Sequence, residues 1–169
     1  MSAETAPIRV LMVCMGNICR SPTAEGVLRH KLQAAGLAGR VEVASAGTHD
    51  YHVGSPPDPR SQEHALLRGY DLSAQRARHF RSSDFACYDW VLVMDDGNHE
   101  LVARSCPPQS AERLRLLMSF APQAGSRIVP DPYYGGADGF ERVLDLVEQA
   151  CDGLIAHIST QIARDARDT

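Results

Sequence analysis

The sequence has little of several features that would assign it at once to a broad class of proteins. No apolar run approaches the ~20 residues that a membrane-spanning helix needs. Lys and Arg number 17 against 21 Asp and Glu, so the formal net charge is −4. This balance argues against general binding to nucleic acid or to an anionic membrane surface. Internal repeats and low-complexity tracts are also missing, which excludes solenoid and fibrous architectures.

Cysteines are few, and their number is odd. Five of them, scattered over 169 residues, do not form the pattern of a disulfide framework. A reducing compartment, and hence a cytoplasmic location, is the simplest interpretation. Residues 1–7 have neither the basic start nor the apolar stretch of a secretory signal. We therefore predict a flexible tail at residues 1–7 and a single domain over residues 8–169.

Short apolar runs alternate with amphipathic stretches of helical length along this domain. Strands are predicted at residues 8–13, 41–45, 90–94 and 114–118. Helices are predicted at residues 22–35, 60–67, 98–104 and 140–164. This alternation predicts an α/β fold, a doubly wound sheet of about four parallel strands with helices on both faces. Ligands bind such sheets beyond the carboxyl ends of the strands, so the loop after residue 13 is the first candidate site.

That loop has the composition of a phosphate-binding loop. It reads CMGNICRS from Cys14 to Ser21 and runs from a buried strand into a helix. Successive backbone N–H groups and a helix N-terminus attract an anion. Arg20 offers a planar guanidinium that meets two phosphoryl oxygens at once. Gly16 would give the backbone the freedom that a tight turn needs, and Ser21 is a candidate N-cap.

Cys14 would lie at the focus of these groups, which favour a thiolate. A thiolate behind a bound phosphate is placed for in-line attack on phosphorus, which gives a cysteinyl-phosphate. The loop matches neither a Walker A nor a dinucleotide-binding motif, and Cys14 and Cys19 lack a second pair at zinc-ligand spacing. No metal or other cofactor is predicted. The alternative is that Cys14 has only a structural role, since a cysteine after an apolar strand is commonly a small buried hydrophobic residue.

Two stretches resemble one known family. VCMGNICRSPTAE (residues 13–25) resembles the signature of the low-molecular-weight protein tyrosine phosphatases, and DPYY (residues 131–134) resembles their acid loop. The similarity extends from about residue 8 to residue 158. The resemblance implies a flavodoxin-like fold and hydrolysis of phosphotyrosine and small aryl phosphates. It implies that Cys14 is the nucleophile, that Arg20 clamps the phosphate and that Asp131 is the general acid and base.

The resemblance also assigns roles around these three residues. The implied phosphate-binding positions are Met15, Gly16, Asn17, Ile18, Cys19 and Ser21. Asn17 and Ser45 are implied to brace the loop, and Ser21 to tune the thiolate. The implied walls of a pocket that fits a phenyl phosphate are Tyr51, Tyr133 and Tyr134. Cys19 is implied to form a reversible disulfide with oxidised Cys14.

The sequence departs from the family pattern at one point. Some members have a His after the second helix that hydrogen-bonds the phosphate loop, but residues 72–76 contain none. Either Gln75 supplies the hydrogen bond to the phosphate loop in place of this His, or that hydrogen bond is missing. The basic run at residues 76–81 is interpreted as a solvated face, and the His-containing loop at 49–52 as ordinary loop polarity.

Four alternatives stay open. A protein-arginine phosphatase of the same fold prefers Thr where Ile18 stands, so Ile18 favours phosphotyrosine. An arsenate reductase would need two further cysteines close together, whereas Cys87 and Cys106 are far apart. A non-enzymatic phosphotyrosine-binding module would have no use for Cys14, and a phosphocysteine carrier domain would not need Arg20.

The expected partners are phosphotyrosine proteins, and phosphate and vanadate are expected to act as inhibitors. We predict a monomer or weak dimer with no nucleic-acid or membrane partner.

Overall fold

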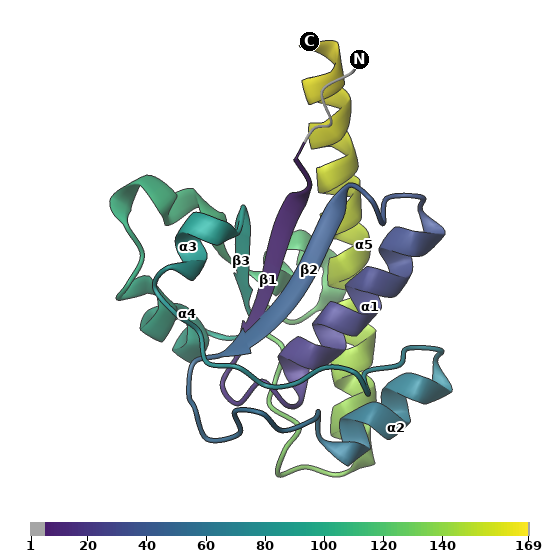
Figure 1. The fold of residues 1–169 in the computed structure, drawn as a ribbon. Helices are drawn as coiled ribbons and strands as arrows, with labels where there is room; N and C mark the ends of the chain where they lie inside the picture. Colours follow the sequence, from purple (N-terminus) through teal and green to yellow (C-terminus); the bar gives the residue numbers. More distant parts are fainter. Residues whose placement is uncertain (1–5, 169) are drawn as a thin grey trace.

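The computed structural model describes residues 6–168, in which strands and helices alternate around one sheet (Figure 1). The strands are β1 (Ile8–Cys14), β2 (Val41–Gly47), β3 (Trp90–Val93) and β4 (Leu114–Leu116). They pair in the order β2-β1-β3-β4, and every pair is parallel. The predicted α/β sheet of about four parallel strands is confirmed. Residues 1–5 of the predicted tail lie outside the described residues.

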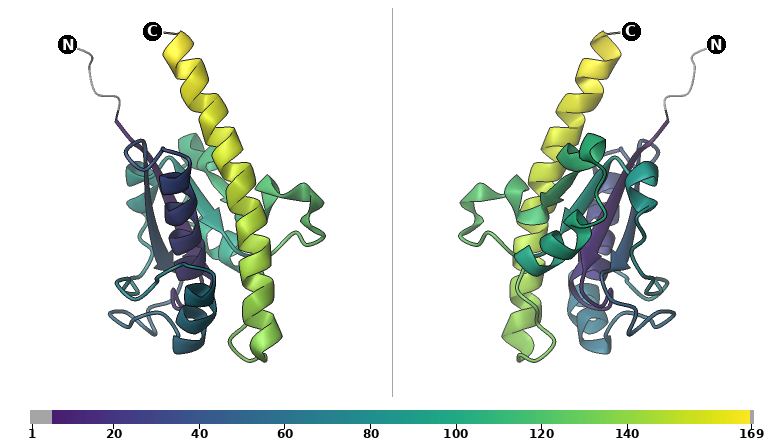
Figure 2. Two further views of the ribbon diagram at one scale, coloured as in Figure 1. Left: turned by 90° about the vertical axis from the view of Figure 1, so that its right-hand side faces the viewer. Right: turned by 90° about the vertical axis from the view of Figure 1, so that its left-hand side faces the viewer.

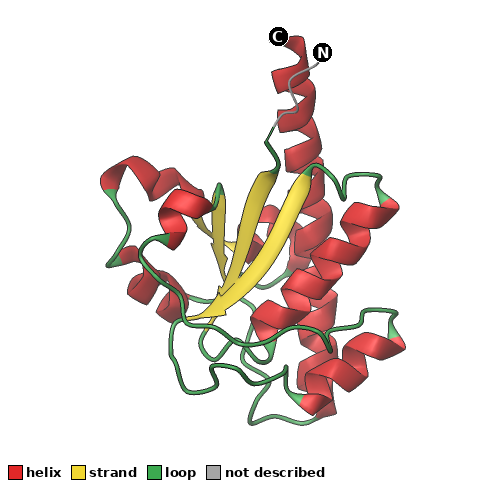
Figure 3. Cartoon of the chain, in the orientation of Figure 1, coloured by secondary structure: helices red, strands yellow, loops and turns green. Residues whose placement is uncertain are grey.

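Helices cover both faces of this sheet. They are α1 (Arg20–Ala34), α2 (Pro59–Leu67), α3 (Asp84–Cys87), α4 (Asp96–Ala103) and α5 (Ala137–Arg167). Helices α1 and α5 lie on one face, and α3 and α4 on the other (Figures 2 and 3). Three 3-10 segments, η1 (Pro108–Arg113), η2 (Leu117–Phe120) and η3 (Pro122–Ala124), follow α4 and flank β4. None of the described helices is long and apolar enough to cross a membrane.

The alternation of side chains along β1 divides the core into two layers. Val10 and Met12 point toward α1 and α5, whereas Leu11 and Val13 point toward α3 and α4. All four are fully buried. The near-continuous apolar run at the start of the domain is thus explained by a central strand that is covered on both faces.

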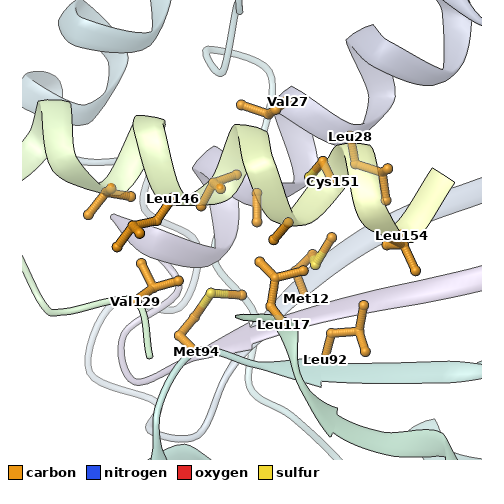
Figure 4. Close-up of a cluster of buried hydrophobic side chains, with 14 of the residues drawn as sticks. Met12, Val27, Leu28, Leu92, Met94, Leu117, Val129, Leu146, Cys151 and Leu154 are labelled. Carbon is orange, nitrogen blue, oxygen red and sulfur yellow. The ribbon is translucent and has the colours of Figure 1, made fainter. Parts of the chain in front are cut away.

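Helix α5 packs lengthwise on the first of these layers. Leu154 of α5 faces Met12 and Leu92 of the sheet (Figure 4). At Gly153 the helix approaches η2 so closely that a Cβ would overlap the carbonyl oxygen of Phe120. This close packing holds α5 against the sheet and so fixes the segment that precedes it.

Several element ends differ from the sequence prediction. Helix α1 begins at Arg20 and not at residue 22, so Ser21 lies in its first turn and is not the N-cap. Cys19 takes the N-cap position and its side chain makes no capping hydrogen bond, whereas the Ser21 hydroxyl lies 3.0 Å from the Cys14 sulfur. Strand β4 ends at Leu116, and the rest of the predicted strand belongs to η2. Helix α5 extends three residues beyond the prediction at each end.

The strand order positions the candidate site. The chain leaves β1 through α1 to β2 on one side of it, and β3 lies on the other side. The crossovers therefore diverge at the carboxyl end of β1, where an α/β sheet has room for a ligand. The loops after β1 and β2 and the segment before α5 gather at this end of the molecule, the lower end in Figure 1.

Candidate active site

The loop from β1 to α1 wraps around the sulfur of Cys14. Cys14 is the buried last residue of β1. The backbone N–H of Asn17 donates to its Sγ at 3.3 Å, and the Ser21 hydroxyl lies 3.0 Å from the same atom. No hydrogen bond found within residues 6–168 uses the N–H groups of residues 15, 16, 18 or 19. Such a loop can accept an anion on its backbone donors.

The tight turn of this loop falls at Asn17, with φ 57°, and not at Gly16 as predicted. Asn is among the residues that tolerate the left-handed region, because its short side chain hydrogen-bonds locally. Gly16 has a different use, since a Cβ there would come within 3.1 Å of the His52 ring. A side chain at this position would require the His52 ring, in the loop after β2, to shift by a few tenths of an ångström.

A buried hydrogen-bond network holds Asn17 in this conformation. Its Nδ2 donates to the hydroxyls of Ser21 at 2.8 Å and Ser45 at 2.9 Å. The Ser45 hydroxyl donates onward to Glu25 at 2.8 Å, and the Oδ1 of Asn17 accepts the backbone N–H of Arg78 at 2.9 Å. Because Ser21 accepts from Asn17, its own proton can go to the Cys14 sulfur at 3.0 Å or to the Ala46 carbonyl at 3.4 Å. The hydroxyl can therefore donate to a thiolate at Cys14.

Gln75 does not brace the loop itself. Its amide donates to the carbonyl of Pro22, in the first turn of α1, at 2.9 Å. The backbone N–H of Arg78 is what reaches Asn17 from this part of the chain. The sequence analysis did not predict that Glu25 and Arg78 take part in this network. Arg78 contributes only its backbone N–H, so its side chain gives no sequence signal for this role.

Arg20 is a buried cation beneath the loop. Its side chain is 2% exposed, and Nη1 donates to Asp95 at 2.6 Å and to the Val129 carbonyl at 3.1 Å. Its Nη2 lies 3.7 Å from Asp131. Burial by itself would lower the pKa of Arg20, but the Cys14 sulfur and the Asp95 carboxylate outweigh burial and raise it. The guanidinium is thus charged and fixed beside the sulfur.

Asp95 is a site residue that sequence reasoning missed. It follows the end of β3, caps α4 by accepting the N–H of Asn98 at 2.8 Å and holds Arg20 with its other oxygen. A signal existed, because the carboxyl ends of parallel strands meet at one edge of a sheet. An acidic residue directly after a second buried strand is therefore a candidate partner for Arg20.

The segment before α5 brings Asp131 to this edge. The N–H of Val129 donates to the carbonyl of Met94, just after β3, at 2.8 Å. Two residues later, the side chain of Asp131 is 41% exposed and accepts the N–H of Tyr133 at 3.0 Å. Asp131 lies over the pocket that opens above Cys14. Residues 117 positions apart thus share one site.

The pocket has a volume of about 200 Å³ and aromatic walls. Residues 14–16 and 18–20 form the floor, and Tyr51, Tyr133 and Tyr134 line the walls together with Asp131. Tyr51 and Tyr134 are 73% and 94% exposed, so they form the rim. His52 also lines the pocket and was not predicted as a site residue. The remaining predicted residues, Asn17, Ser21 and Ser45, support the floor from behind.

Cys19 lies in the same loop with a free thiol. Burial raises the pKa of Cys19 to about 12, although a hydrogen bond from Ser61 opposes the rise. The thiol is therefore protonated at neutral pH. Among residues 6–168, no three His, Cys, Asp or Glu side chains are grouped so that they could hold a metal ion.

Comparisons with known proteins agree on one family. Residues 9–166 match the family model of the low molecular weight phosphotyrosine protein phosphatases. A low molecular weight protein-tyrosine-phosphatase of Streptomyces coelicolor is 45% identical over 157 residues, which cover 91% of this chain and 95% of that protein. The human low molecular weight phosphotyrosine protein phosphatase is 38% identical over 151 residues, 88% of this chain and 94% of that protein.

Solved structures give the same result. A protein tyrosine phosphatase from Entamoeba histolytica, with Hepes in its active site, superposes with a TM-score of 0.89 at 38% identity, covering 91% of this chain and 98% of that one. A Drosophila arginine phosphatase superposes with a TM-score of 0.82 at 30% identity, covering 89% and 98%. The fold and these similarities define a phosphatase. The chain belongs to the low molecular weight protein-tyrosine phosphatase family.

Proposed function

We propose that this phosphatase hydrolyses phosphotyrosine through a cysteinyl-phosphate intermediate, with Cys14 as nucleophile, Arg20 as phosphate clamp and Asp131 as general acid and base. One observation carries the proposal. The Cys14 sulfur receives an N–H from Asn17, lies 3.0 Å from the Ser21 hydroxyl and sits in the floor of a pocket that Asp131 overhangs. These donors favour the thiolate, and they converge where a phosphoryl dianion would bind.

In the first step, the Cys14 thiolate attacks phosphorus from the side opposite the ester oxygen. The S–P bond forms as the P–O bond to the phenol breaks, and the Asp131 carboxyl protonates the departing oxygen. Arg20 and the loop N–H groups neutralise charge on the three remaining phosphoryl oxygens. Asp131 lies on the open side of the pocket, as an acid for the leaving group requires.

In the second step, a water molecule attacks phosphorus and the S–P bond breaks. Asp131, now a carboxylate, accepts the proton of that water. Phosphate leaves and the Cys14 thiolate is restored. Inorganic phosphate and vanadate would occupy the same loop and act as inhibitors.

The walls of the pocket favour an aromatic ester. Tyr51, Tyr133 and Tyr134 surround the opening, so that a flat ring fits between the rim and Cys14. Ile18 adds an apolar group to the floor. Phosphoarginine is the second candidate, because the similar Drosophila structure is an arginine phosphatase. We propose that its substrates are phosphotyrosine proteins in the cytoplasm. We also propose that the phosphatase is a monomer or a weak dimer.

The test of this function is a comparison of matched peptides that carry phosphotyrosine, phosphoserine or phosphoarginine. Phosphate release from the phosphotyrosyl peptide is expected to exceed that from the phosphoseryl peptide by a factor of about 100 or more, since a short side chain does not reach the sulfur. Rapid acid quench with ³²P-labelled phosphotyrosyl peptide should trap label on Cys14. Preference for phosphoarginine would instead support the second candidate, and normal turnover without any trapped label would contradict the mechanism.

We further propose that Cys19 protects Cys14 during oxidation. Peroxide converts the Cys14 thiolate to a sulfenic acid, and the Cys19 thiolate then attacks that sulfur, forming the S–S bond as hydroxide leaves. Because the pKa of Cys19 is raised to about 12, its thiolate fraction rises about tenfold per pH unit between pH 7 and 9. We expect the rate of bridge formation under excess peroxide to rise with it.

Peptide mapping by mass spectrometry at each pH measures the Cys14–Cys19 bridge. Cys19→Ser is the matched control, and it should leave Cys14 to proceed to sulfinic acid. A bridge that never forms, or a rate that does not change with pH, would contradict this role of Cys19.

A further inference from the structure

The first turn of α2 contacts the phosphate loop. The backbone N–H of Asp58, the N-cap of α2, donates to the carbonyl of Ile18 in the phosphate loop at 2.8 Å. Ser61 of the same turn lies close enough to Cys19 to oppose the rise in the pKa of its thiol. The start of α2 is therefore attached to the phosphate loop by a backbone hydrogen bond.

The side chain of Arg60 extends from this turn toward the segment before α5. Its guanidinium binds both oxygens of Asp58, with Nε at 3.1 Å and Nη2 at 2.9 Å. It also lies 5.4 Å from the ring centroid of Tyr133 and 4.8 Å from that of Phe140. Because Asp58 is buried and capping α2, the fork of the guanidinium is held in one orientation. Both rings thus pack against a charged plane that does not rotate freely.

Tyr133 in turn is joined to Asp131. The N–H of Tyr133 donates to Oδ1 of Asp131, so a shift of this residue changes the direction of the carboxyl group. The other end of the segment is anchored separately, by Val129 on Met94 and by Arg20 on the Val129 carbonyl. Between these ends the segment has no regular secondary structure. Its far end continues into α5, whose Phe140 lies against the same guanidinium as Tyr133.

We propose that Arg60 is a positioning residue, which aims the Asp131 carboxyl at the leaving group by holding the ring of Tyr133 against the first turn of α2. This inference rests on the proposed role of Asp131 as the acid. Arg60 itself touches neither the phosphate loop sulfur nor the floor of the pocket. Arg60 acts by fixing the position of Tyr133, and not by attracting the substrate with its charge.

The experiment uses Arg60→Met, which keeps an unbranched aliphatic chain but removes the planar guanidinium group and its charge. We expect kcat/KM for phenyl phosphate, whose leaving group needs a proton, to fall about 10- to 100-fold. We expect kcat/KM for dinitrophenyl phosphate, whose leaving group does not need one, to change less than about twofold. Arg60→Lys keeps the charge without the planar fork and should show most of the loss. Arg104→Met removes another exposed, carboxylate-paired guanidinium far from the pocket and should change neither substrate.

A double-mutant cycle separates positioning from a general structural effect. In an Asp131→Asn background, Arg60→Met should cause no further loss, because the group it positions is already gone. Equal losses on both substrates, a full loss in the Asp131→Asn background, or no loss at all would overturn the proposal. These results would leave the effect of Asp131→Asn itself intact, so they are distinguishable from a failure of the proposed acid role.

Discussion

Replacing Cys14 with serine is expected to abolish hydrolysis of phosphotyrosyl peptides while leaving phosphate and vanadate binding in place. The serine hydroxyl is a far weaker nucleophile than a thiolate. Removal of a nucleophile from a comparable covalent mechanism lowers turnover by roughly 10⁴- to 10⁶-fold. The loop N–H groups and Arg20, which are proposed to hold the anion, remain in place in this variant. Kinetics of phosphate release and calorimetric titration with phosphate measure the two effects.

The matched control for this variant is Cys87→Ser, since Cys87 is an exposed free thiol away from the pocket. It should keep full activity. If Cys14→Ser retained activity within about tenfold of the wild type, thiolate attack would be wrong. If it lost phosphate binding as well, the loop would depend on the sulfur for its structure, which the network around Asn17 argues against.

Replacing Asp131 with asparagine is expected to slow the first chemical step in proportion to how much the leaving group needs a proton. General acid catalysis contributes about 10²–10⁴ in rate. We expect kcat/KM for phenyl phosphate to fall within this range, and kcat/KM for dinitrophenyl phosphate to fall far less. Asparagine keeps the size of the side chain and its ability to accept the N–H of Tyr133. The measurement is the slope of log kcat/KM against the pKa of the leaving phenol, which should become steeper in the variant.

The control for this prediction is Asp138→Asn in the first turn of α5, a carboxylate outside the pocket. It should leave the slope unchanged. An equal loss for all leaving groups in Asp131→Asn would show that Asp131 acts on binding or on structure and is not the acid.

Local patterns along the chain were strong enough to predict the sheet and the first half of the site. The apolar run of β1 identified a strand that is buried on both faces, and the Cys14–Ser21 loop followed it directly. Short pieces were missed for a physical reason. Helix α3 has four residues and the 3-10 segments have three to six, too few for a helical period to show.

The errors inside the site have a different origin, which is contact between distant parts of the chain. Gly16 was predicted to make the tight turn because glycine is permissive everywhere, yet the turn falls at Asn17. Ser45 and the backbone of Arg78 hold Asn17 there, and they come from distant parts of the chain. Asp95 was missed as the partner of Arg20 because only the pairing of β1 with β3 brings the two residues together.

The amino-acid sequence by itself determined which groups are proposed to carry the chemistry, because the proposed nucleophile, a guanidinium and backbone donors within eight consecutive residues need only one loop to act together. The tertiary structure alone decided what surrounds them. The parallel sheet brings the ends of β1 and β3 side by side, so that Asp95 meets Arg20, and the packing of α5 delivers Asp131 to the mouth of the pocket. Contacts of this kind depend on chain segments up to 117 residues apart, and no local pattern encodes the distance between them.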